Sequence, residues 1–305
     1  MIPPRPWTLD TLARLPAGVV LCVLAGATLA SATRYDAASA KLAVPWFCLL
    51  ILAGAGAFIA ALILLLRDWS VEDFGRRAAV FCALLFIGLN LGLVAGKFSG
   101  AAPDTQPGFL QIVIATLALQ GASLGLVAWF LRRNAMRWRH AFGLHHSPAR
   151  AAGWGLLLGL IALPVLLLLQ AQCVALLTKF GWHPQQQTMV EVFQQMDSLP
   201  GKLYLGFAAL VLAPVTEEIL FRGLLYPALK QFIRPGNALA LSSLVFAAMH
   251  ANAASFVPLG VFAVALALLC DRTQNLIAPI VAHATFNAGN VILMLYFQSA
   301  VPAAP

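Results

Sequence analysis

Residues 203–229 read LYLGFAALVLAPVTEEILFRGLLYPAL, an apolar stretch that contains two adjacent glutamates, Glu217 and Glu218, and an arginine, Arg222. A helix needs about 20 apolar residues to cross a bilayer. An ionisable side chain at that depth costs roughly 2.5–3.5 kcal/mol on insertion scales, so charged residues kept in such a segment are candidates for function. The stretch therefore predicts a transmembrane helix and a site within the membrane.

The composition of the whole chain agrees with this reading of one segment. Of the 305 residues, 61% are hydrophobic and only 10% are charged, against roughly 25% charged residues in a soluble domain. A water-soluble globule is thereby excluded. The net charge of +8 comes from basic residues scattered over short loops, so no nucleic-acid partner is expected.

Apolar runs of spanning length recur along the chain and predict an all-α, polytopic transmembrane bundle of about eight to nine membrane-spanning helices. The expected spans are 17–33, 42–66, 78–96, 109–131, 152–178, 203–229, 237–255, 256–270 and 276–297. An interfacial helix is expected within 179–202. We predict four N-terminal spans and a basic cytoplasmic loop over 1–151, a second domain over 152–297 and a short tail over 298–305.

The distribution of basic residues predicts the orientation in the membrane. Lysine and arginine gather in the N-terminus and in alternate loops, above all between Arg132 and Arg150. Basic loops stay on the cytoplasmic side, so we expect a cytoplasmic N-terminus. The Ala- and Leu-rich composition, with more Arg than Lys, favours the plasma (inner) membrane of a prokaryotic cell.

Spacing along the helix separates the roles of the two glutamates. Glu218 and Arg222 lie at i and i+4, on one face, where they can form an ion pair, and a purely structural pair is the simplest interpretation. Glu217 is rotated by about 100° from Glu218, so it is available to a different neighbour. A carboxylate there can act as a general base on water.

Two histidines, His250 and His283, are the other ionisable residues predicted inside the membrane. His250 can share the water that Glu217 activates. His283 and Asn287 are again at i and i+4, and two fixed hydrogen-bond donors are what a peptide carbonyl needs when it becomes an oxyanion. A single membrane histidine often only bridges helices, so the combination carries the prediction of amide hydrolysis.

Three motifs in this order resemble those of the CAAX protease and bacteriocin-processing (CPBP) family. Residues 217–222, EEILFR, resemble its EExxxR motif, residues 246–250, FAAMH, resemble FxxxH, and residues 283–287, HATFN, resemble HxxxN. The resemblance implies an intramembrane glutamate endopeptidase that needs no metal and no cofactor. Its implied catalytic residues are Glu217, His250, His283 and Asn287, with Glu218, Arg222 and Phe246 supporting the site.

The expected substrate is a membrane-associated protein or peptide, and the oligomeric state stays open. Three other functions remain compatible with the residues. A non-catalytic membrane scaffold or immunity protein could share the fold, and a zinc protease could use two histidines and a glutamate, although HExxH is absent. A proton-coupled transporter could use Glu217 as a relay, but no inverted repeat supports it.

Overall fold

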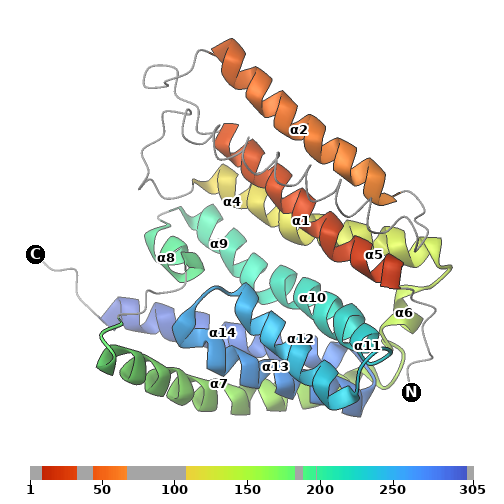
Figure 1. Ribbon diagram of the computed structural model, residues 1–305. Coiled ribbons are helices and arrows are strands. Elements are labelled where there is room, and N and C mark those ends of the chain that lie inside the picture. Colours follow the sequence, from red (N-terminus) through yellow and green to blue (C-terminus); the bar gives the residue numbers. More distant parts are fainter. Residues whose placement is uncertain (1–8, 33–43, 67–107, 183–187, 197, 301–305) are drawn as a thin grey trace, which may run out of the picture. The chain divides into compact units, whose positions relative to one another are not determined.

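The computed structural model describes residues 9–32, 44–66, 108–182, 188–196 and 198–300, and the regular elements in these ranges are helices (Figure 1). They fall into two compact units, one ending at Arg133 and one beginning at Asn134, and each is described by itself. The second unit holds every residue that the sequence analysis assigned to the site. The predicted domain boundaries at 151 and 297 stay predictions.

The segment with the two glutamates is one continuous helix that alternates between α and π geometry. It comprises α9 (Leu199–Phe207), η2 (Ala208–Leu212), α10 (Ala213–Glu218), η3 (Ile219–Leu225) and α11 (Tyr226–Leu229), of which η2 and η3 are π-helical. A proline, Pro214 or Pro227, is the second residue after each π segment. In an α-helix a proline has no N–H to donate, and its ring collides with the carbonyl group of the residue four positions earlier. The extra residue of a π turn relieves that collision, which explains the wider turns on both sides of the glutamates.

Four long helices pack around this segment in the second unit: α7 (Pro148–Lys179), α12 (Pro235–Met249), α13 (Ala253–Thr273) and α14 (Ile277–Ala300). α7 lies along α14 and α13, and α12 packs on α13 (Figure 1). α14 also contacts α10 and η2, so the last helix lies directly against the glutamates.

Small residues set how closely α7 approaches α14. Gly155 and Gly159 are one turn apart on α7. A Cβ built on Gly155 would collide with the backbone of Ala278, and one on Gly159 would lie 2.6 Å from the Cβ of Thr285. Glycines spaced in this way allow helix backbones to approach closely in a membrane. The close contact between α7 and α14 fixes the position of α14, and therefore also the positions of the side chains on its central turns.

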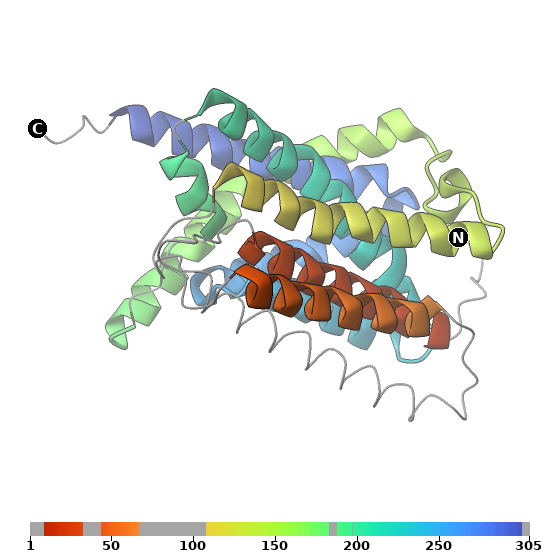
Figure 2. The same ribbon diagram turned by 90° about the horizontal axis from the view of Figure 1, so that it is seen from above.

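The first unit is built around α1 (Leu9–Ala32). Its other helical segments are α2 (Val44–Leu66), α4 (Phe109–Thr116), η1 (Leu117–Gly121) and α5 (Ala122–Arg133), and α1 contacts each of them. Figure 2 shows α1 and α2 side by side. Leu21 and Phe58 form a buried cluster between them. The predicted span over 78–96 lies outside the described residues.

The predicted count of eight to nine spans is not confirmed. Five helices in the described ranges are long and apolar enough to cross a membrane, at Phe109–Arg133, Pro148–Lys179, Leu199–Leu229, Ala253–Thr273 and Ile277–Tyr296. The apolar parts of α1 and α2, at Ala17–Ala27 and Val44–Ala60, are shorter, as is α12. The 15 residues of α12 rise only about 22 Å, which is less than the roughly 30 Å of a hydrocarbon core.

The boundary between the seventh and eighth expected segments lies earlier in the chain than the sequence predicts. The expected segment over 237–255 ends as α12 at Met249, and α13 begins at Ala253. Asn252 caps α13, since its Oδ1 accepts a hydrogen bond from the N–H of Ser255 at 3.0 Å. In the expected interfacial segment, the structure has α8 (Thr188–Gln195).

Candidate active site

The centre of the site is Glu218, whose side chain is fully buried. Its Oε1 accepts two hydrogen bonds of 2.8 Å, one from Nη1 of Arg222 on the next turn and one from Nδ1 of His283 on α14. The second nitrogen of Arg222, Nη2, donates to the carbonyl of Ala263 on α13 at 3.0 Å. One carboxylate thus joins the glutamate helix to α14, and its arginine joins the helix to α13.

Aromatic rings enclose the arginine. The guanidinium carbon of Arg222 lies 4.6 Å from the ring centroid of Phe246 on α12, a cation–π geometry. Phe246 in turn packs edge-on against Phe221 at 5.0 Å. Both rings belong to one buried cluster with Ala263. The arginine is therefore held by packing as well as by hydrogen bonds, and it is only 3% exposed.

His283 lies between the two glutamates. While Nδ1 faces Glu218, Nε2 lies 3.9 Å from Oε2 of Glu217. The imidazole is fixed on its sides by edge-on contacts with Phe246 at 5.9 Å and Phe262 at 5.8 Å. Because a carboxylate only accepts hydrogen bonds, Nδ1 carries the hydrogen that Glu218 accepts. In the neutral ring Nε2, the nitrogen directed at Glu217, then carries the lone pair.

Glu217 differs from its neighbour in its surroundings. Its side chain is 29% exposed, whereas that of Glu218 is fully buried. One of its oxygens, Oε2, is nevertheless enclosed and, like Oε2 of Glu218, has no hydrogen-bond partner in the part of the chain that the structure describes. Buried carboxylate oxygens are normally hydrogen-bonded. Glu217 therefore combines an opening to the outside with an oxygen able to accept a hydrogen.

His250 lies at the C-terminal end of α12, half-buried beside Phe246. Its Nδ1 lies 2.9 Å from the carbonyl of Phe246, and the two rings are 4.9 Å apart. A carbonyl can only accept, so Nδ1 is the protonated nitrogen and Nε2 carries the lone pair in the neutral ring. The side chain of His250 is therefore oriented by its own helix, and its Nε2 can accept a hydrogen bond.

Asn287 is bound to the backbone of the glutamate helix. Its Nδ2 donates to the carbonyl of Ala209 at 2.8 Å. Within the π turn the N–H of Ala213 reaches the carbonyl of Ala208, five residues back. The next residue, Pro214, has no N–H to give to Ala209. The asparagine supplies the hydrogen bond that the proline cannot, and it retains a second amide hydrogen.

Residues 199–289 match the family model of the Rce1-like type II CAAX prenyl endopeptidases. This chain contains an Rce1-like domain. The match covers just under a third of the 305 residues, and it includes all seven site residues. The predicted family is thereby confirmed, and it is a family of peptidases. No curated protein and no solved structure matches the chain at a significant level.

Three further groups in the Rce1-like domain were not found from the sequence. The carbonyls of Ala263 and Ala209 hold Arg222 and Asn287, and Phe262 packs on His283. A backbone carbonyl leaves no trace in a residue pattern, although Pro214 signals an unpaired one nearby. In the parts of the chain that the structure describes, no three His, Cys, Asp or Glu side chains are grouped to hold a metal ion.

Proposed function

We propose that the chain is an intramembrane endopeptidase that hydrolyses a peptide bond of a membrane-associated protein or peptide, with Glu217 activating the water. The observation that supports this most is that Glu217, unlike the fully buried Glu218, is partly exposed while its Oε2, unpartnered among the described residues, lies 3.9 Å from Nε2 of His283. The match to a peptidase family over 199–289 supports the same conclusion. Glu217, Glu218, Arg222, His283 and Asn287 of the proposed site lie in helices of spanning length.

In the proposed reaction Glu217 takes a proton from water as the water oxygen bonds to the carbonyl carbon of the substrate. The O–H that the water keeps donates a hydrogen bond to Nε2 of His250. The carbonyl oxygen becomes an oxyanion, which receives hydrogen bonds from His283 and from the second amide hydrogen of Asn287. Collapse of the intermediate breaks the C–N bond, and the proton held by Glu217 moves to the leaving amine.

The fixed tautomer of His283 sets a condition on this mechanism. Since Nδ1 donates to Glu218, Nε2 can donate to an oxyanion only if the ring is an imidazolium. The four groups Glu217, Glu218, Arg222 and His283 then carry two negative and two positive charges. A buried group of charges that sums to zero avoids the cost of an uncompensated ion. Glu218 and Arg222 are thus positioning residues that support the charge on His283.

The shortness of α12 explains how His250, at its C-terminal end, can lie inside the membrane at the level of Glu217. The helix begins at Pro235, beside the charged residues Lys230 and Arg234. Its rise of about 22 Å ends before the opposite surface. His250, which ends the helix, would then lie inside the membrane together with water that reaches Glu217.

The substrate class is tested by offering purified protein in liposomes a set of membrane-anchored peptides, in pairs with and without a C-terminal prenyl group. Products are identified by mass spectrometry. Wild-type protein should cleave at least one peptide, Glu217→Gln should cleave none, and Glu191→Gln on α8 should cleave like the wild type. Cleavage that survives Glu217→Gln would reject the proposed base, and a cellular phenotype that survives it would favour a non-catalytic scaffold.

A further inference from the structure

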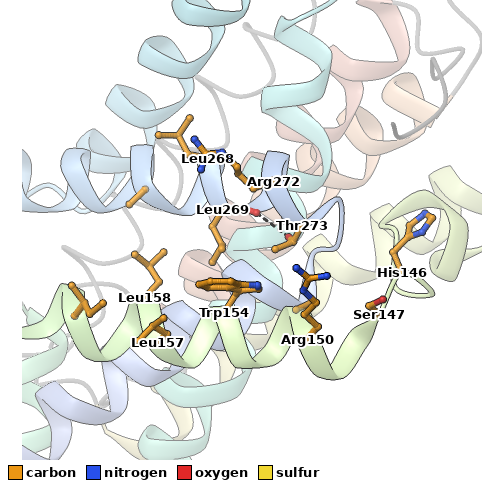
Figure 3. Close-up of a pocket in the computed structure, with 13 residues that line it drawn as sticks. His146, Ser147, Arg150, Trp154, Leu157, Leu158, Leu268, Leu269, Arg272 and Thr273 are labelled. Atoms are coloured by element: carbon orange, nitrogen blue, oxygen red, sulfur yellow. Dashed lines mark hydrogen bonds between the residues drawn. The ribbon is translucent and has the colours of Figure 1, made fainter.

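A groove of about 710 Å³ opens between α7 and α13 (Figure 3), and none of the seven residues of the proposed active site lines it. Its walls are apolar along most of their length and basic at one end. The lining residues named in Figure 3 include Trp154, Leu157 and Leu158 from α7, Leu268 and Leu269 from α13, and Arg150 and Arg272. The volume is in the range of sites for small organic ligands.

The apolar part of the groove faces outward. Trp154 is 47% exposed, and Leu157 and Leu268 are each 45% exposed. α7 and α13 are both of spanning length, so these side chains are expected to meet lipid tails rather than water. Tryptophan is enriched where a helix leaves the hydrocarbon, and Trp154 lies in the second turn of α7. The groove thus begins at the membrane surface and continues along the hydrocarbon.

The basic end carries two exposed guanidinium groups, those of Arg150 and Arg272. Among the described residues, no carboxylate pairs with either of them. The neighbouring carboxylate, Asp271, is engaged instead by Nζ of Lys230 and by the hydroxyl of Tyr226, at 2.8 and 2.7 Å. The two guanidinium groups therefore present uncompensated positive charge at the end of an apolar groove.

The basic end is held in place by contacts between two loops. Asn275 donates from Nδ2 to the carbonyl of His146 at 2.7 Å, and the N–H of Leu276 donates to the carbonyl of Phe142 at 3.1 Å. These bonds fasten the turn between α13 and α14 to the chain just before α7. Ser147, which precedes α7, lines the groove. The positive end of the dipole of α7 adds to the field of the arginines.

We propose that this groove binds one anionic phospholipid, with its phosphate at the basic end that Arg150 and Arg272 line and an acyl chain along Trp154, Leu157 and Leu268. Two guanidinium groups match a phosphate, and exposed apolar walls match a chain that stays in the bilayer. A soluble phosphate would use only the basic end. Arg150 belongs to the basic loop that the distribution of lysine and arginine predicts to be cytoplasmic, where anionic lipids attract basic residues.

The groove is connected to the proposed active site through packing. Leu158 and Leu269, which line it, pack on a buried cluster that contains Phe262, Leu266 and Ala282. Phe262 is the ring that holds His283 from one side. A bound lipid would fill the open side of this cluster, so we expect it to raise the thermal stability of the chain.

The test is lipid retention by the full-length protein in detergent, measured by native mass spectrometry with added phosphatidylglycerol, phosphatidylcholine or glycerol phosphate. The variant is Arg150→Gln with Arg272→Gln, and its matched control is Arg139→Gln with Arg234→Gln, two exposed arginines outside the groove. Each basic residue near a lipid surface contributes about 1 kcal/mol. We therefore expect the variant to bind phosphatidylglycerol about 10- to 30-fold more weakly and the control to bind it like the wild type.

Three results would overturn the proposal. They are equal retention of phosphatidylglycerol and phosphatidylcholine by the wild type, equal retention of phosphatidylglycerol by wild type and variant, and binding of glycerol phosphate as tight as that of the lipid. The last would show a site for a soluble phosphate. A second variant, Ala265→Trp, fills the groove without changing charge and should also release the lipid. Apparent melting temperatures without lipid check that each variant is folded.

Discussion

Glu217 and Glu218 are adjacent in sequence, yet the same substitution should affect stability very differently at the two positions. Glu218 is fully buried and accepts hydrogen bonds of 2.8 Å from Arg222 and His283. Removing one partner of a buried ion pair costs about 3–5 kcal/mol, and glutamine keeps the shape, so we expect about 3 kcal/mol for Glu218→Gln. Glu217 is partly exposed and 3.9 Å from its histidine, so Glu217→Gln should cost less than about 1 kcal/mol.

These values convert into a difference in melting temperature that is easily measured. For a unit of 150–250 residues, 1 kcal/mol corresponds to about 2–4 °C. Glu218→Gln should therefore lower the apparent melting temperature by roughly 6–12 °C, and Glu217→Gln by no more than about 4 °C. The assay is thermal unfolding of detergent-purified wild type and both variants, followed by circular dichroism. Equal shifts, or a larger shift for Glu217→Gln, would refute the division into a supporting and a reactive glutamate.

Two further predictions concern α14. Gly155→Ala should destabilise the chain by about 1–3 kcal/mol in the same unfolding assay, because the added Cβ collides with the backbone of Ala278. Gly153→Ala is the control: its added Cβ meets open space, so the variant should be as stable as the wild type or more stable by up to about 1 kcal/mol. Asn287→Ala leaves the carbonyl of Ala209 without its donor and should cost about 1–3 kcal/mol, while Asn287→Gln, if it reaches the carbonyl, should recover part of that stability. A destabilised Gly153 variant or a fully stable Asn287→Ala would contradict these assignments.

The sequence predicts the contacts that lie within one helix better than those between helices. The spacing of Glu218 and Arg222 places them on one face in any α-helix, and the structure has them 2.8 Å apart. The contact of Glu218 with His283 joins residues 65 positions apart, and no spacing rule indicates it. Asn287 was expected to be an oxyanion donor, and its bond to Ala209 depends on a π turn that hydropathy does not reveal.

The ends of the helices are likewise predicted less well from the sequence than their presence. Hydropathy identifies the apolar stretches, but it continues the segment from 237 through 255 because only three residues, His250 to Asn252, separate the apolar end of α12 from the apolar start of α13. The end of α12 depends on local backbone geometry: Ala251 has a positive φ of 48°, and Asn252 caps the next helix. An asparagine directly before an apolar run is a usable start signal for a helix.

The most direct test of the proposed mechanism is the initial rate of cleavage of one identified peptide by purified protein in liposomes. It compares wild type, wild type with a strong zinc chelator, and Glu217→Gln. Glutamate catalysis without metal predicts an unchanged rate with chelator and a rate at least about 100-fold lower for Glu217→Gln, since general base catalysis contributes about 10²–10⁴-fold. A rate abolished by the chelator and restored by zinc, or an undiminished rate for Glu217→Gln, would contradict it.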